Sequence, residues 1–214
     1  RSRFPDHDIV TEETHIERTG ARTVWYVDPL DGTVNFAHGY PFFSASVAVA
    51  VDGRAVAAAV YDPIKEELFT AERGQGAFLN GRRLRVSGAS ELVKSLLVTG
   101  FPYDVHEDVD GKVRLFRAFM GVAQAIRRDG SAALDLCYLA AGRIDGFWEE
   151  RLNAWDMAAG NLMIEEAGGR VSRYDGSPLA LRHDEIVASN GLLHAAMLGV
   201  VRADQAALAA ASRA

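Results

Sequence analysis

The chain has 214 residues, of which 49% are apolar and 24% charged, and its formal net charge is −6. This length and composition are those of a folded domain with a substantial core, and the acidic balance is not that of a nucleic-acid binder. No stretch reaches the ~18 apolar residues needed to cross a bilayer, and the single cysteine, Cys137, has no internal disulfide partner, so we expect a cytoplasmic protein.

The first residues with a clear pattern predict a sheet. Residues 23–27 are β-branched and aromatic and predict a strand that ends where Asp28 begins a loop of acids, proline and glycine. The apolar runs 42–51 and 55–61 flank Asp52-Gly53, a strong signal for a two-residue hairpin turn. We therefore expect two long antiparallel strands here.

A second hairpin follows. Residues 67–71 and 76–79 predict a strand pair, and Asn80-Gly81 supplies another two-residue turn before a short strand at 84–86. Residues 1–100 are thus expected to form a sheet-rich lobe with antiparallel strands.

The pattern changes near residue 100, where helical spacing begins to alternate with strands. The segment 101–214 is expected to form a mixed αβ lobe, with the two lobes making one catalytic unit. Its expected elements, after a strand at 95–99, are helices at 113–124, 131–141, 155–167 and from 192, and strands at 144–149 and 186–188.

The most informative segment is Asp28-Pro29-Leu30-Asp31-Gly32-Thr33. Two carboxylates at the end of a buried strand resist ionisation together unless a cation lies between them. Proline and glycine allow the loop to curl, which exposes carbonyl oxygens that can ligate Mg²⁺ and amides that can hold phosphate. The segment predicts a site for Mg²⁺ and phosphate.

This segment has three other interpretations. It could be a simple turn, in which such residues are common. It is not an EF-hand, whose ligands alternate, because Pro29 and Leu30 break that pattern. The haloacid-dehalogenase type of phosphatase needs a nucleophilic aspartate two residues before Asp31, where this chain has Pro29, so a covalent aspartyl-phosphate is disfavoured.

Two further acidic segments strengthen the metal hypothesis. Asp156 lies in the first turn of a predicted helix, where the helix dipole favours an ionised carboxylate. Glu12-Glu13 adds an acidic pair upstream. Either feature alone is more often an ordinary surface acid than a ligand.

Taken together and in this order, Glu12-Glu13, the 28–33 segment and Trp155-Asp156 resemble the inositol monophosphatase family. Gly130-Ser131-Ala132-Ala133 and Gly168-Gly169 are similar to that family too, so the resemblance covers nearly the whole chain. It implies an α/β (α+β) fold, a layered αβαβα sandwich with an antiparallel N-terminal sheet, and a homodimer. It also implies dependence on Mg²⁺ and inhibition by Li⁺.

The resemblance also implies roles for particular residues. Two or three Mg²⁺ ions would be held by Glu12, Asp28, Asp31, Asp156 and the main-chain carbonyl of Leu30. Glu13 and Thr33 would orient the attacking water. The phosphate and polyol would be bound by Asp31, Gly32, Thr33, Gly130, Ser131, Ala132, Glu149 and Asp156. The family's first helices, and an aspartate that partners the threonine matching Thr33, would precede Arg1.

The expected activity is hydrolysis of inositol monophosphate, or of a similar small polyol phosphate, by direct attack of a metal-activated water. Alternatives within the same superfamily are fructose-1,6-bisphosphatase, histidinol-phosphatase and nucleotide 3′-phosphatase. An alternative of another class is a regulatory interaction protein.

Overall fold

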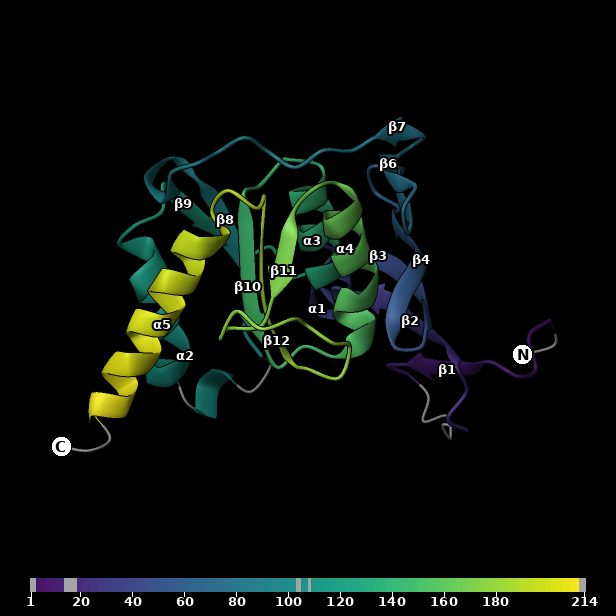
Figure 1. Ribbon diagram of the computed structural model, residues 1–214, viewed down its shortest axis with the longest axis horizontal. Coiled ribbons are helices and arrows are strands. Elements are labelled where there is room, and N and C mark those ends of the chain that lie inside the picture. The colour runs from purple at the N-terminus through teal and green to yellow at the C-terminus, as the bar shows by residue number, and fades with distance from the viewer. Residues whose placement is uncertain (1–2, 14–18, 103–104, 108, 212–214) are drawn as a thin grey trace.

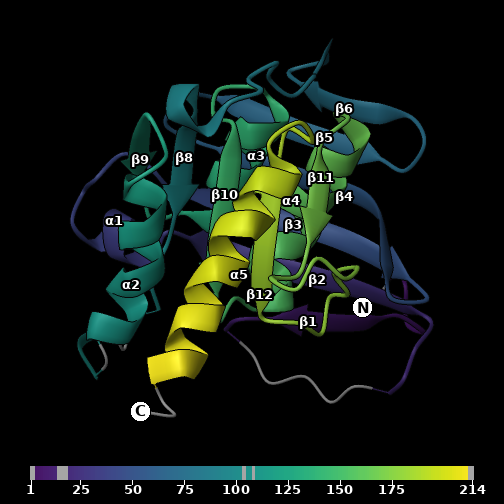
Figure 2. The same ribbon diagram turned by 60° about the vertical axis from the view of Figure 1, so that its left-hand side comes forward.

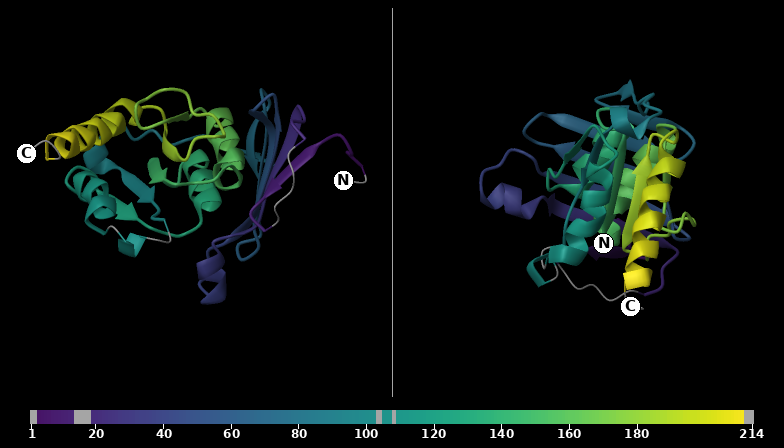
Figure 3. Two further views of the ribbon diagram at one scale, coloured as in Figure 1. Left: turned by 90° about the horizontal axis from the view of Figure 1, so that it is seen from below. Right: turned by 90° about the vertical axis from the view of Figure 1, so that its left-hand side faces the viewer.

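The computed structural model describes residues 3–13, 19–102, 105–107 and 109–211. These residues build two sheets and two helical layers (Figure 1). Edge-on, the layers follow the order sheet, helices, sheet, helices (Figure 3). The α/β layered fold is therefore confirmed.

The first sheet has seven strands that lie side by side in chain order. They are β1 (Asp8–Thr11), β2 (Thr23–Asp31), β3 (Ser44–Val51), β4 (Arg54–Asp62), β5 (Glu67–Glu72), β6 (Gly76–Leu79) and β7 (Arg82–Arg83). All neighbouring pairs are antiparallel except β1 and β2, which run parallel. The expectation of an antiparallel sheet is therefore wrong at this edge, because Asp8 pairs with Val24 and Thr11 with Val27, so that both strands run in the same direction.

Both predicted hairpin turns are confirmed. The φ angles are 51° at Asp52 and 77° at Gly53, and 47° at Asn80 and 78° at Gly81. Positive φ at both central residues is what a type I′ turn requires.

The strand expected at 84–86 is wrong. The N–H of Val86 donates to the carbonyl of Ala167 at 3.2 Å, so the chain has already left the sheet and runs along the end of another element. A short apolar run does not reveal that its hydrogen-bond partner lies about eighty residues away.

The sequence predicts that β2 ends before Asp28. In the structure the strand continues to Asp31 instead. Asp28 pairs with Ser46 and Asp31 with Ser44, and the register shifts between these two pairs. Pro29 falls within this bulge, where its missing N–H costs the ladder nothing. The bulge allows both acids to stay on the buried strand.

The second sheet has five strands in the order β11-β12-β10-β8-β9, with two antiparallel and two parallel pairings. The strands are β8 (Leu96–Thr99), β9 (Ala125–Arg127), β10 (Gly146–Glu150), β11 (Arg170–Ser172) and β12 (Glu185–Ser189). Three-residue β9 and β11 were too short to be recognised from the sequence. Because β8 belongs here, the second sheet begins before residue 100, the expected boundary between the lobes.

Helices fill the space between the sheets and cover the outer face of the second one. They are α1 (Thr33–Ala37), α2 (Val109–Met120), α3 (Ala132–Ala140), α4 (Ala154–Glu166) and α5 (His194–Ala211), with short 3₁₀ turns η1 (Leu92–Lys94) and η2 (Val105–Glu107). The helix expected at 113–124 begins and ends four residues earlier, and its last residues join the connection to β9. None of the helices in these described ranges is both long and apolar enough to cross a membrane.

The central layer consists of α3 and α4, which pack against each other and against the first sheet. A Cβ added at Gly160 of α4 would lie 2.3 Å from the Cβ of Leu136, so only glycine allows α3 to come this close.

On the far side, α2 and α5 lie next to each other over the second sheet (Figure 2). Phe119 and Trp148 stack there at 4.0 Å between ring centroids. The outer face of the second sheet is thereby covered.

Candidate functional site

A cavity of about 500 Å³ opens where the end of β2 meets the start of α3, the end of β10 and the start of α4. It brings together residues from segments far apart in the sequence. All the site residues predicted from the sequence line it except Glu13, namely Glu12, Asp28, Leu30, Asp31, Gly32, Thr33, Gly130, Ser131, Ala132, Glu149 and Asp156.

The 28–33 segment is held by its own hydrogen bonds. The N–H of Leu30 donates to Oδ1 of Asp28 at 2.9 Å, and the hydroxyl of Thr33 donates to the carbonyl of Leu30 at 2.9 Å. Gly32 has a φ of 89°, and a Cβ there would lie 3.0 Å from the carbonyl oxygen of Phe42. The turn after Asp31 therefore requires glycine.

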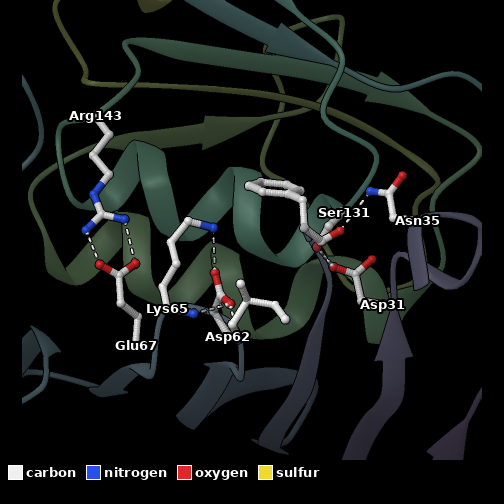
Figure 4. A network of polar contacts seen from close by, with 9 residues as sticks. Asp31, Asn35, Asp62, Lys65, Glu67, Ser131 and Arg143 are labelled. Atoms are coloured by element: carbon white, nitrogen blue, oxygen red, sulfur yellow. Dashed lines mark hydrogen bonds and ion pairs between the residues drawn. The ribbon is translucent and has the colours of Figure 1, made fainter. Parts of the chain in front are cut away.

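Asp31 is the most firmly positioned of the acids. Its Oδ2 accepts hydrogen bonds from the hydroxyl of Ser131, from the N–H of Ala133 at 3.0 Å and from the hydroxyl of Ser44 at 3.4 Å. Figure 4 shows the Asp31 and Ser131 side chains pointing toward each other. Burial raises the pKa of Asp31 to about 6, although these hydrogen bonds favour the charged form.

Asn35 of α1 joins this arrangement from the other side. Its Nδ2 donates to the carbonyl of Phe42 at 2.7 Å and to that of Asp129 at 2.8 Å. Gly130, with a φ of 87°, passes so close that a Cβ would lie 3.1 Å from this nitrogen. The segment before α3 is thus tied to α1.

The other acids lie close enough for their charges to interact. Burial, and then the charge of Asp31, raises the pKa of Asp28 to about 8, and Glu12 and Asp156 act in the same direction. Burial raises the pKa of Asp156 to about 7, with Asp31 and Glu12 again contributing. These carboxyls therefore share one electrostatic environment.

Glu12 and Glu13 follow β1 and are both exposed. The buried carboxylate of Asp8 anchors the chain after them, because it accepts hydrogen bonds from the N–H groups of Thr19, Gly20 and Ala21 at 3.0 to 3.2 Å. Glu12 reaches the cavity, whereas Glu13 does not line it.

Several residues that line the cavity carry no signal in the sequence, among them Asp135 and Arg128. Asp135 of α3 is 2% exposed, and its Oδ1 has no hydrogen-bond partner among the described residues. Burial, followed by the charges of Asp129 and Glu149, raises its pKa well above the usual range. Arg128 also lines the cavity, and its charge acts on Asp135 and Glu149. A single acid in an apolar helix and one arginine in a loop carry no sequence signal.

The donor chemistry of the cavity fits a hard divalent cation. Carboxylate and carbonyl oxygens are the ligands that Mg²⁺ prefers, and the raised pKa values show acids that need a nearby positive charge to ionise together. In the described part of the chain, however, no group of three or more Asp, Glu, His or Cys side chains could hold an ion as placed.

Comparison with known proteins agrees with this geometry. The sequence profile described as the inositol monophosphatase family matches residues 1–206. The Nus factor SuhB of Pseudomonas aeruginosa is 48% identical over 207 residues, covering 94% of this chain and 76% of the relative. The inositol-1-monophosphatase of Synechocystis is 45% identical over 195 residues, covering 91% and 68%.

Solved structures show the same relationship. An inositol monophosphatase from Anabaena superposes with a TM-score of 0.91 at 43% identity, covering 94% of this chain and 81% of that one. An inositol monophosphatase from Thermotoga maritima gives a TM-score of 0.85 at 37% identity, covering 95% and 77%. With the sequence profile matched over nearly its whole length, the chain belongs to the inositol monophosphatase family.

Proposed function

We propose that this phosphatase-family chain hydrolyses the phosphate monoester of a small polyol, inositol monophosphate first among them, with Mg²⁺. The observation that carries the proposal is the convergence of acids from three distant segments on one cavity, where burial and mutual repulsion raise their pKa values. Such an arrangement disfavours ionisation of these acids unless a cation compensates them.

Particular residues would hold the ions and the phosphate. Glu12, Asp28, Asp31, Asp156 and the carbonyl of Leu30 would ligate two or three Mg²⁺. The N–H groups of Gly32 and Thr33 stand at the start of α1, where no acceptor inside the helix is available to them, and would hold phosphate oxygens. Gly130, Ser131, Ala132 and Glu149 would line the side that takes the polyol.

Bound Mg²⁺ would neutralise phosphate charge and lower the pKa of a water molecule. The side chains would then position that water for in-line attack, with no covalent enzyme intermediate. The Thr33 hydroxyl would help to orient the water, because its hydrogen bond to the carbonyl of Leu30 fixes its direction. Glu13 would contribute only after turning toward the cavity, which it does not line in this structure.

The substrate assignment is tested by a turnover panel. We expect Mg²⁺-dependent release of phosphate to be faster from inositol 1-phosphate than from fructose 1,6-bisphosphate, histidinol phosphate or adenosine 3′,5′-bisphosphate. Faster release from any of the other three would reject the polyol assignment and favour the corresponding phosphatase.

Ser131→Ala should weaken the site without unfolding the protein. The substitution removes one donor to Asp31 but leaves the N–H of Ala133 in place. Loss of an outer hydrogen-bond partner of a ligating carboxylate typically costs ~10–100-fold in metal affinity or activity. A Mg²⁺ titration of phosphate release measures this effect, with Ser90→Ala, at an exposed loop position, as the matched control. A Ser131→Ala curve that overlays the wild-type curve would show that this hydrogen bond does not matter.

We also propose that the protein is a homodimer in the cytoplasm. Three large apolar residues on and beside α1 are strongly exposed, with relative exposures of 49% for Val34, 54% for Phe36 and 53% for Tyr40. Such a cluster is typical of a protein interface. Phe36→Ser should convert dimer to monomer in sedimentation analysis, whereas Leu192→Ser, at an equally exposed site 61% accessible, should not. A monomeric wild type would refute the dimer.

The names of the bacterial relatives support a second candidate. Several relatives that are 46–48% identical are called Nus factor SuhB, which is a regulatory name rather than an enzymatic one. In a bacterium deleted for its own SuhB, a regulatory role independent of catalysis predicts equal rescue by wild type and by Asp31→Asn. Rescue by the wild type alone would tie the phenotype to the phosphatase site.

A further inference from the structure

The end of β8 carries an unusual contact beside the cavity. Gly100 follows β8, and both Gly100 and Glu149 of β10 line the cavity. A Cβ built on Gly100 would lie 2.1 Å from Oε1, 2.3 Å from Cδ and 2.4 Å from Oε2 of Glu149. The Glu149 carboxyl therefore occupies the space that any other residue at position 100 would need.

The two strand ends beneath this contact are firmly joined. Trp148 pairs with Thr99, and the Thr99 hydroxyl donates to the carbonyl of Trp148 at 2.6 Å. Gly100 and Glu149, the next residues, are thereby held next to each other. Rotation of the Glu149 side chain is then the simplest way to relieve a clash at Gly100.

Gly100 is not required for its backbone conformation. Its φ lies outside the left-handed region, where glycine alone is comfortable. The atoms that an added methyl would meet first belong to the flexible end of one side chain and not to backbone. Gly100→Ala is therefore expected to fold and to displace the Glu149 carboxyl from its position.

We propose that Gly100 is a positioning residue that keeps the Glu149 carboxyl at the wall of the cavity, and that this placement selects substrates whose leaving group carries hydroxyls. The inference rests on the proposed function. Carboxyl oxygens accept hydrogen bonds from hydroxyls, which a polyol offers and an aryl group lacks. The glycine thus acts on specificity through Glu149 and does not itself touch the reacting phosphate.

The test is a double-mutant cycle on two substrates. Wild type, Gly100→Ala, Glu149→Ala and the double variant are assayed with Mg²⁺ on inositol 1-phosphate and on 4-nitrophenyl phosphate, an ester without hydroxyls. The ratio of kcat/KM for the polyol to that for the aryl ester should fall about tenfold in each single variant, as expected for loss of a hydrogen bond. The double variant should fall no further than Glu149→Ala alone, because the two changes remove the same contact.

Two controls separate the possible causes. Gly88→Ala is the matched glycine substitution, since a Cβ there meets nothing within 4 Å; it should leave the ratio unchanged. Thermal melts should place Gly100→Ala close to wild type.

Each other outcome has a definite meaning. An unchanged ratio in Gly100→Ala, or effects of the two substitutions that multiply in the double variant, would overturn the inference while leaving the phosphatase proposal intact. A wild type that releases no phosphate from either ester would instead refute the proposed function, and the inference with it.

Discussion

Replacing Asp28 by asparagine should abolish Mg²⁺-dependent release of phosphate and leave the metal-free fold as stable as the wild type, or more so. The reason is electrostatic. Asp28 is 2% exposed, and burial and the charge of Asp31 raise its pKa to about 8. An amide of the same shape removes a buried acid that the fold disfavours in its charged form, and with it a proposed ligand of the ions.

Two measurements on Asp28→Asn test this together. Turnover should fall to background at every Mg²⁺ concentration. In thermal melts without metal, the midpoint should be unchanged or higher, with ~1 kcal/mol corresponding to about 2–4 °C for a chain of this size. The Mg²⁺-induced rise of the wild-type midpoint should be largely lost.

A matched control is Asp62→Asn. Asp62 is equally buried, but it pairs with Lys65 at 3.0 Å and is not among the cavity residues. Figure 4 shows this pair on its own, apart from Asp31 and Ser131. Asp62→Asn should lower the midpoint and keep the metal-induced rise. If Asp28→Asn kept the full rise, Asp28 would not be a ligand.

The second large effect expected is a fall in the stability of the metal-free protein as pH rises. A carboxyl whose pKa is raised in the folded state binds its proton there at a pH where the unfolded chain has released it. Stability then falls as pH rises from the unfolded value of about 4 to the folded value, and changes no further above it. With pKa values raised to about 8 for Asp28 and about 7 for Asp156, the metal-free protein should lose stability up to about pH 8.

This effect is best followed from pH 6.5 to 8.5, where Glu149 acts in the same direction because burial also raises its pKa to about 8. Below this window, His194 contributes the opposite slope, because burial lowers its pKa to about 4 and the unfolded chain takes up a proton first. Within the window, the metal-free melting midpoint should fall with pH. The gain from saturating Mg²⁺ should grow with pH, since ligation requires the ionised carboxylates and releases their protons.

Asp28→Asn serves as the check on the cause. Removing the acid with the higher of these two pKa values should make the metal-free slope near pH 8 less steep, and Glu149 should keep part of it. A metal-free midpoint that is flat or rises with pH across the window would contradict the account of these buried acids.

Much of the architecture followed from local chemistry. The Asp52-Gly53 and Asn80-Gly81 turns were predictable because a type I′ turn demands residues that accept positive φ. The helices of the second half were predictable from apolar spacing. Short strands such as Arg170–Ser172 were not, because three residues have too little pattern and their pairing depends on β12.

The candidate site was predictable from the types of residues and their order along the chain, whereas its geometry was not. Acids, proline and glycine in residues 28–33 predicted a loop with metal chemistry, but not the bulge that keeps Asp31 on the strand beside Ser44. Asp135 and the Gly100–Glu149 contact had no signal, because a buried acid in a helix and a glycine after a strand are ordinary in sequence. They can be identified as cavity residues only in the folded structure, where α3 and β10 line the cavity.

The central claim is that acids distant in the sequence bind divalent ions beside the phosphate. A crystal grown with Mn²⁺ in place of Mg²⁺ and measured at the manganese edge tests it most directly. The account predicts anomalous peaks within ligand distance of Asp28, Asp31 and Asp156. An active protein whose manganese lies elsewhere, or whose cavity shows no anomalous peak, would contradict it.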